Sequence, residues 1–392
     1  MNRAENPFTP GAGVLPPELA GRKNIIDDGD VLAARIIAHR YERGLMLIGP
    51  RGVGKTVLLK YMAESSRTRG VIPVRVEIRK DGGDIEQLSR RLKDALCLID
   101  FKSQLKNKVN TAFATLRNFV KQFSINIGEL GLAVETRVSV GGSGNMEYDL
   151  SEVLLSVAHA ANESGVAVGL YIDELQNLDV AAMRGIIVAL HTAAQDLLPL
   201  YLVGSGLPTV RALVGKSKTY AERMFVYHEI GPLDEKATAD AIRMPLNNRR
   251  VNIEEEAVAE IFNSSRGYPY FIQECGYAAW NNAADGMILS EDIKAVLPMV
   301  QMSLDKNFFD VRFDRVSPRE REFLRAMADF GDEPQFSEVA EKMGTSLSSL
   351  SRVRASLITK GMIYSPKAGK LAYTVPMFGD YMKRVNYEMG DI

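Results

Sequence analysis

The sequence is poor in the residues that build disulfide frameworks and metal clusters. Among 392 residues it has only two cysteines, Cys97 and Cys275, which lie far apart. Two distant cysteines argue against a disulfide-stapled fold and are typical of a reducing compartment. Four histidines are scattered without paired ligand spacing, so we expect ordinary core or surface residues rather than zinc ligands.

The chain also lacks a strong net charge and a long apolar run. Its formal net charge is -1, so any attraction to nucleic acid or to a membrane must come from a local basic surface. No stretch approaches the ~20 apolar residues that a membrane-spanning helix needs. Residues 1–24 contain no apolar core of a secretory signal. We therefore expect a cytoplasmic protein with no membrane partner.

What the sequence does contain is an alternation of apolar strands and helices. We expect strands at residues 44–49, 72–78, 166–172, 199–205 and 224–230. Helical patterns lie near residues 28–43, 54–65, 84–99 and 180–196. Fully apolar strands alternating with helices predict an α/β fold, in which helices cover both faces of a parallel sheet.

The length predicts two or three domains. An extended, Pro- and Gly-rich segment comes first, and the sequence pattern then changes several times along the chain. We expect the segment at 1–20, an α/β domain at 21–232 with an insertion at 102–148, a small helical domain at 233–310, and a C-terminal domain at 316–392. The insertion combines an amphipathic helix with a hairpin-like stretch, "GLAVETRVSV". The apolar stripe of this helix predicts packing on its own domain or, alternatively, a partner or self-assembly surface.

The stretch "GPRGVGKT", Gly49 to Thr56, matches the phosphate-binding pattern G-x-x-x-x-G-K-[ST] in full. It follows a buried strand and opens a helix, whose N-terminus adds about half a positive charge. We expect Lys55 to reach the β- and γ-phosphates and the Thr56 hydroxyl to bind Mg²⁺. The full pattern and its context favour a nucleotide site over a Gly-rich turn with a chance lysine. The predicted nucleotide contacts are Gly49, Pro50, Arg51, Gly52, Val53, Gly54, Lys55, Thr56 and Val57.

A second motif supplies the carboxylates that such a site needs. In "VGLYIDELQNL" an apolar strand leads to Asp173 and Glu174. We expect Asp173 to hold Mg²⁺ and Glu174 to orient or deprotonate the attacking water. An acid after a strand is also an ordinary helix cap, but together with the phosphate loop the pair favours hydrolysis over mere binding.

These motifs, with the following "LYLVGSG", resemble the P-loop ATPases of the AAA+ and STAND groups. These include the origin-recognition initiators and the archaeal ATPase family, whose second motif often reads apolar-Asp-Glu-x-Gln. The resemblance covers residues 21 to about 375. It implies a P-loop NTPase fold, ATP and Mg²⁺ as ligands, ATP hydrolysis and a helical domain that acts as a lid. It also implies assembly into a homo-oligomer on ATP binding, or with another protein.

Carried over residue by residue, the resemblance implies four further roles. Arg22, in "LAGR", would flank the adenine, and Ser205 would position the attacking water. Arg223 would complete a neighbouring subunit's site as an arginine finger, and Pro269 would open a lid helix near the phosphates. The last three have an ordinary alternative: a strand-end serine, a surface arginine and a helix-capping proline.

Two departures from the families bear on this likeness. The acidic residue that usually follows "LAGR" is replaced by Lys23 and Asn24. The arginine that initiators carry on the lid helix is absent, which favours the STAND group. The Asn-Lys-x-Asp motif that recognises guanine is also missing from the sequence, which argues against GTP as the nucleotide.

The C-terminal pattern of helix, helix, turn, helix and β-hairpin is the layout of a winged helix. Residues 345–376 carry five basic and no acidic side chains. Such a stripe predicts contact with double-stranded DNA or, alternatively, a protein dock or an intramolecular gate. The candidate DNA contacts are Ser348, Ser349, Arg352, Arg354, Lys367 and Lys370.

Together these features predict an ATP-hydrolysing switch. Closure of the lid over ATP and Mg²⁺ would reposition the winged helix, with DNA as one target. Two alternatives stay open. One is a STAND-type regulatory or defence switch that oligomerises on ATP and does not bind DNA, and the other is a nucleotide-gated scaffold without turnover.

Overall fold

The computed structural model describes residues 1–11, 13–80, 83–102, 107–125, 143–284 and 286–385. By their contacts the residues divide into two compact units. One unit comprises Arg22–Ile48 and Lys55–Glu229, and the other comprises Met1–Gly21, Gly49–Gly54 and Ile230–Ile392.

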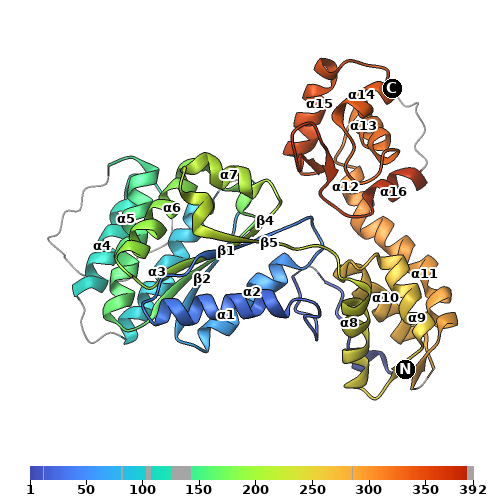
Figure 1. Ribbon diagram of the computed structural model, residues 1–392, viewed down its shortest axis with the longest axis horizontal. Helices are drawn as coiled ribbons and strands as arrows, with labels where there is room; N and C mark the ends of the chain where they lie inside the picture. The colour runs from blue at the N-terminus through green and yellow to red at the C-terminus, as the bar shows by residue number, and fades with distance from the viewer. Residues whose placement is uncertain (12, 81–82, 103–106, 126–142, 285, 386–392) are drawn as a thin grey trace. The chain divides into compact units, whose positions relative to one another are not determined.

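The first of these units is built on a five-stranded parallel sheet (Figure 1). Its strands run in the order β2-β3-β4-β1-β5, and every pairing is parallel. Each strand end lies within one residue of the position that the sequence predicts, which confirms the α/β class. The bounds are β1 Gly44–Ile48, β2 Val71–Glu77, β3 Ala167–Asp173, β4 Leu200–Gly206 and β5 Phe225–Glu229.

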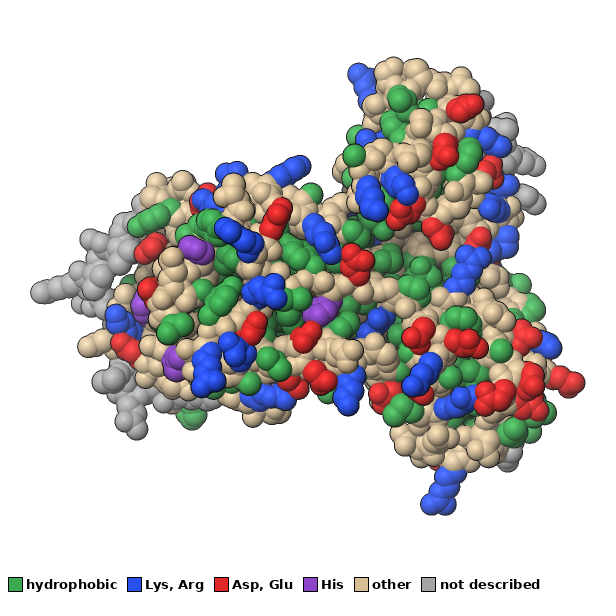
Figure 2. Space-filling model, in the orientation of Figure 1, with side chains coloured by type: hydrophobic (Ala, Val, Ile, Leu, Met, Phe, Trp, Pro, Cys, Tyr) green, Lys and Arg blue, Asp and Glu red, His purple; other side chains and the backbone are tan. Residues whose placement is uncertain are grey.

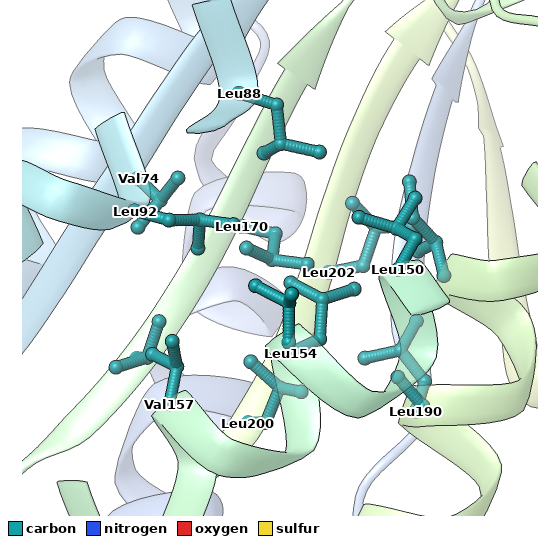
Figure 3. Close-up of a cluster of buried hydrophobic side chains, with 14 of the residues drawn as sticks. Val74, Leu88, Leu92, Leu150, Leu154, Val157, Leu170, Leu190, Leu200 and Leu202 are labelled. Carbon is teal, nitrogen blue, oxygen red and sulfur yellow. The ribbon is translucent and has the colours of Figure 1, made fainter. Parts of the chain in front are cut away.

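Helices cover both faces of this sheet. On one face lie α1 (Lys23–Ile37) and α2 (Lys55–Arg67), and the Tyr171 hydroxyl of β3 donates a hydrogen bond to Met62 O of α2 (3.4 Å). On the other face, leucines and valines from the sheet pack against those of the helices (Figure 3). These helices are α3 (Asp84–Lys102), α5 (Met146–Glu163) and α6 (Val180–Gln195).

The insertion between β2 and β3 belongs to this core. The helix α4 (Asn107–Gln122) buries Val109, Phe113 and Leu116 in the same apolar cluster as the sheet. Of the two alternatives for its apolar stripe, packing on its own domain is therefore confirmed. The predicted hairpin at 131–140 lies outside the described residues.

The helix α5 was not predicted from the sequence. It mixes apolar and polar residues, and it buries Leu150, Leu154 and Val157 in the same apolar cluster as the sheet.

In the second unit, four helices follow one another between residues 235 and 304. They are α8 (Glu235–Asn247), α9 (Glu255–Ser265), α10 (Pro269–Asn282) and α11 (Ser290–Leu304). Two short parallel strands, β6 (Asn252–Ile253) and β7 (Met287–Ile288), join them.

The N-terminal segment lies against α10. The side chain of Phe8 is buried, and a Cβ on Gly276 of α10 would come within 2.6 Å of its ring. The indole Nε1 of Trp280 donates a hydrogen bond to Asn2 O (2.8 Å). This segment therefore packs on the helical bundle.

The C-terminal part of this unit has three helices followed by an antiparallel pair of short strands. A π-helical turn (Asp305–Asp310) and α12 (Val311–Phe313) precede them. The elements are α13 (Pro318–Ala328), α14 (Phe336–Lys342), α15 (Leu347–Thr359), β8 (Ile363–Tyr364), β9 (Ala372–Tyr373) and α16 (Phe378–Arg384). Up to β9 this is the predicted order of elements. That they form a winged helix, and that the domains divide at 233, 310 and 316, stays a prediction.

Charges of both signs are interspersed over the face of the molecule that Figure 2 shows. This mixture agrees with the formal net charge of -1 and leaves little long-range field of one sign. Within the described part of the chain, none of the helices has the length and apolar character needed to cross a bilayer.

Candidate nucleotide-binding site

The turn between β1 and α2 has the backbone that the phosphate-binding pattern requires. Gly52 and Gly54 have φ angles of +80° and +91°, in the left-handed region that side chains disfavour. At Gly49 a Cβ would come within 2.0 Å of Ile230 O, so no side chain fits there. The turn leads directly into α2, and the unpaired amides at the N-terminus of a helix favour the binding of an anion.

Lys55 is the first residue of α2 and is only 7% exposed. Lysine is almost never this buried unless its ammonium group has a partner. Among the other predicted contacts, Val53 is buried, and Gly52 and Thr56 are exposed. The remaining residues of the turn and Val57 are half-buried, apart from the buried Gly49. The lysine is thus held at the end of the sheet instead of extending into solvent.

Asp173 connects the two motifs. The Thr56 hydroxyl donates a hydrogen bond to its Oδ2 (2.6 Å), and the Ser205 hydroxyl donates one to its Oδ1 (2.5 Å). The backbone amide of Glu174 also donates to Oδ1 (2.9 Å). Asp173 is 5% exposed, so these donors satisfy both oxygens of a buried carboxylate.

The strand order explains why these three side chains meet. Strand β4 lies between β1 and β3, and its Ser205 pairs in register with Leu47 near the end of β1. The carboxyl ends of parallel strands share one edge of the sheet, which is where ligands bind in open α/β folds. Ser205, which the resemblance places at the attacking water, thus lies in the same hydrogen-bonded group as Thr56 and Asp173.

The residues at this edge fit Mg²⁺. The Thr56 hydroxyl and the Asp173 carboxylate provide neighbouring hard oxygen ligands, and Mg²⁺ usually takes only one or two protein ligands beside phosphate and water. Among the residues that the structure describes, no group of three or more His, Cys, Asp or Glu side chains could form a metal cage. A Thr–Asp pair of this kind suits a metal ion that arrives with a nucleotide.

Glu174 follows at the end of β3 with a left-handed backbone, at a φ angle of 54°. Its carboxylate Oε2 accepts a hydrogen bond from Gln176 Nε2 (2.5 Å). Gln176 was not predicted to belong to the site. The signal was present in the sequence, because the second motif of the resembled families often reads apolar-Asp-Glu-x-Gln and "IDELQ" fits it.

Three residues predicted by resemblance lie on other elements. Arg22 is the N-cap residue of α1, and Pro269 is the first residue of α10 in the other unit, where proline caps a helix favourably. Arg223 is exposed in a short helix (Ala221–Met224) directly before β5. No described residue forms an ion pair with the Arg223 guanidinium. The adenine, finger and lid roles of these residues stay predictions.

Three of the five basic residues at 345–376 have partners inside their own domain. Arg354 donates a hydrogen bond to Ser365 Oγ (2.7 Å) and lies over the ring of Phe336. Lys370 pairs with Glu333 (3.1 Å) and Lys360 pairs with Glu320 (2.6 Å). These contacts were not visible in the sequence.

Burial disfavours ionisation of Glu320, which is 4% exposed. Hydrogen bonds from Lys360, Ser356 and Ser317 outweigh that effect and lower the pKa of Glu320 to about 2. The ion pair therefore joins a buried carboxylate, Glu320, to a lysine whose side chain is 36% exposed.

The other DNA candidates are exposed. Ser348 and Ser349 lie in the first turn of α15, with their hydroxyls 2.9 and 2.8 Å from Ser346 Oγ. Arg352 and Lys367 are exposed and form no ion pair with any residue in the described ranges. The surface left for DNA is thus narrower than the charge count of the sequence indicates.

Comparison with known families and curated proteins gave two matches to parts of the chain. Residues 38–207 match the family model of an AAA domain. Residues 306–382 match the model of a domain of unknown function (DUF8462). No curated protein matches the chain.

Several solved structures resemble the chain over nearly its whole length. A Walker-type ATPase of Pyrococcus abyssi aligns with a TM-score of 0.56 and 15% identity, over 95% of this chain and 99% of that chain. The ORC1 protein of Aeropyrum pernix in complex with DNA aligns with a TM-score of 0.47 and 13% identity, over 94% and 93%. The RuvB Holliday junction branch migration motor of Thermotoga maritima aligns with a TM-score of 0.46 and 16% identity, over 97% and 100%.

The last two likenesses are too loose to support an argument, and the first shows the fold. No comparison separates the STAND group from the others, so that part of the resemblance stays a prediction. The sheet order and the hydrogen-bonded group around Asp173 agree with the family match. Residues 38–207 therefore match an AAA domain, on a fold similar to that of a Walker-type ATPase.

Proposed function

We propose that the protein binds ATP together with Mg²⁺ and hydrolyses the nucleotide. The observation that carries this proposal is the convergence on Asp173, where Thr56 from α2 and Ser205 from β4 donate to the two carboxylate oxygens. Glu174, the next residue, adds a second carboxylate at the same edge of the sheet. A chain that only bound nucleotide would need the phosphate turn but not this second acid.

Each residue has a separate task in this proposal. The turn Gly49–Gly54 and Lys55 bind the phosphates, and Thr56 and Asp173 hold the metal ion. When bound, Mg²⁺ neutralises charge on the β- and γ-phosphate oxygens. Glu174 orients a water molecule and accepts its proton as the water attacks the γ-phosphate. Ser205 keeps the Asp173 carboxylate in position.

We further propose that ATP acts as a switch signal. Closure of the helical region at 233–310 would change how the C-terminal region at 316–392 is presented. The order of the AAA domain, helical bundle and C-terminal helices along the chain supports this scheme, as does Pro269 at the start of α10. An exposed Arg223 supports assembly of several copies, in which it would reach a neighbour's nucleotide.

The target of the switch is either DNA or a protein. Contact with double-stranded DNA would rest on Ser348, Ser349, Arg352 and Lys367, since Arg354 and Lys370 have partners in their own domain. Few phosphate contacts would give weak, salt-sensitive binding. The internal pairing favours the alternative, a STAND-type switch that oligomerises on ATP without DNA.

The cytoplasm is the location that we propose. Cys97 and Cys275 are both free thiols, and Cys275 is buried. Free thiols are typical of a reducing compartment.

A steady-state phosphate-release assay tests these proposals. The full chain is assayed with ATP and Mg²⁺, with and without duplex DNA at low salt, and its mass is measured with and without ATP. Turnover that DNA changes supports a DNA-acting ATPase. Turnover that is the same with and without DNA, together with an assembly mass that rises when ATP is added, supports the STAND-type switch. Binding without turnover would overturn hydrolysis and leave a nucleotide-gated scaffold.

A further inference from the structure

The turn that follows β3 is held from both sides. Gln176 lies in a short 3-10 helix, Leu175–Asn177, and its Oε1 accepts a hydrogen bond from the backbone amide of Leu207 (2.9 Å), just beyond β4. Asn177 Nδ2 donates to Ile78 O (3.1 Å), just beyond β2. The turn is thus tied to the strands on either side of β3.

Two glycines on β4 make room for this turn. A Cβ at Gly204 would come within 2.2 Å of Leu175 Cδ1, and a Cβ at Gly206 would come within 2.3 Å of Gln176 Oε1. Neither glycine has a positive φ angle, so space and not backbone conformation excludes a side chain there. The sequence "GSG" at 204–206 therefore admits Leu175 and Gln176 against β4.

Gln176 also reaches the carboxylate of the proposed water-orienting acid. Its Nε2 donates to Glu174 Oε2 (2.5 Å), while its Oε1 is occupied by Leu207 N. Glu174 itself has a left-handed backbone, a conformation that is strained for a non-glycine residue and typical of functional sites. One amide side chain therefore joins the Glu174 carboxylate to the residue that follows β4.

We propose that Gln176 is the positioning residue for Glu174 in the proposed ATP hydrolysis. The segment Ser205–Leu207 then sets both acids of the site. Ser205 holds Asp173, and Leu207 holds Glu174 through Gln176. A general base acts efficiently only when its geometry is held in place, and residues that hold a catalytic group usually matter through kcat and not through binding. This inference rests on the proposed function.

The variant Gln176→Glu separates positioning from folding. It keeps the shape of the side chain and the oxygen that accepts from Leu207 N. It removes the hydrogen-bond donor to Glu174 and places a second carboxylate beside that of Glu174, so that the two negative charges repel each other. At pH 8 we expect kcat to fall about tenfold or more while KM for ATP stays within about threefold. As the pH is lowered toward about 6, a proton shared between the two carboxylates restores a donor, and kcat should recover.

Two further variants control for structural effects. Gln176→Met loses both hydrogen bonds, and its kcat should fall at every pH without recovery. Asn177→Asp makes the same chemical change on the same turn, but at an amide that binds Ile78 O and not Glu174. Its ratio of kcat to wild type should not change with pH.

The outcomes decide between the two proposals. If wild-type protein hydrolyses ATP and Gln176→Glu keeps the wild-type kcat and pH profile, the positioning role is wrong. A pH-independent loss in Gln176→Glu that equals the loss in Asn177→Asp would also overturn it. If Gln176→Glu does not fold, an unchanged kcat in Gln176→Met would likewise show that the positioning role is wrong. Wild-type protein that binds a fluorescent ATP analogue without turnover overturns the proposed hydrolysis itself.

Discussion

The nucleotide site and the C-terminal basic region are both runs of chemically telling residues, yet they fold into opposite arrangements. At the edge of the sheet, side chains from α2 and β4 converge on Asp173. In the C-terminal region, Arg354, Lys360 and Lys370 instead find partners inside their own domain. The residues around Asp173 form a connected site, whereas three of the five basic side chains in the C-terminal region are held by contacts inside their own domain.

The contrast follows from what determines each position. A parallel sheet places the ends of its strands at one edge, so residues that follow apolar strands meet whatever the rest of the chain does. Nothing comparable fixes where a lysine on a small helical domain points. Its long side chain takes any nearby carboxylate or hydroxyl, and such a pair satisfies the charge without an external partner.

The largest expected effect is at Glu174 and tests the connected site directly. Glu174→Gln keeps the size of the side chain and removes the base, so turnover should fall about a hundred- to ten-thousandfold. Affinity for ATP should stay near wild type, because the phosphate turn is untouched. The measurement is single-turnover hydrolysis beside equilibrium binding. The matched control is Glu64→Gln, an exposed glutamate on α2. Normal hydrolysis by Glu174→Gln would show that the second acid has another role.

Removal of Lys55 should act on binding instead. Lys55→Ala takes away the buried ammonium that we assign to the phosphates, and affinity for ATP should fall at least about a hundredfold. Titration with a fluorescent ATP analogue measures the change. Lys60→Ala, a half-buried lysine on the same helix, should bind as wild type does. Equal affinities for the two variants would place the phosphates elsewhere.

The pairing inside the C-terminal domain should be visible as stability. The pKa of Glu320 lies at about 2, below its ordinary 4.5. Its charge therefore stabilises the folded state fully above pH 4.5, and this contribution is lost as the pH falls toward 2. The depressed pKa corresponds to roughly 3 kcal/mol. Glu320→Gln should lose about that much at pH 7.

Hydrogen exchange across α13 and α15 measures this loss locally. The wild-type protein should lose protection between pH 4.5 and 2, and Glu320→Gln should change less over the same window. The control is Glu322→Gln, whose partner Arg319 is exposed on the same helix. If Glu320→Gln exchanges as slowly as wild type at pH 7, the ion pair contributes nothing.

The smallest expected effect concerns DNA and separates the exposed cations from the paired ones. If the region binds duplex DNA, the double variant Arg352→Gln, Lys367→Gln should lower affinity a few-fold and reduce the salt slope by about 2. The matched variant Arg354→Gln, Lys370→Gln should change the slope less, because these cations have partners already. Wild-type protein that binds no duplex at low salt would favour the STAND-type alternative.

Short local patterns were sufficient for much of this protein. Runs of buried residues marked the three inner strands, β1, β3 and β4, because a strand buried on both faces has no polar alternation to obscure it. The phosphate turn was equally easy to recognise in the sequence, since glycine is the residue that readily adopts the φ angles of Gly52 and Gly54. From these two facts the sequence alone determined the α/β class and indicated where the proposed nucleotide site lies.

Tertiary structure decided what local patterns do not encode. It packed α5 into the core of the sheet domain, brought Ser205 onto Asp173 and joined Gln176 to Leu207. It also paired basic side chains of the C-terminal domain with acids and hydroxyls outside their own helix or turn. These contacts join residues that are distant in the chain or on different elements. Their geometry depends on strand order and packing, whereas periodicity and motif spacing describe only neighbours along the sequence.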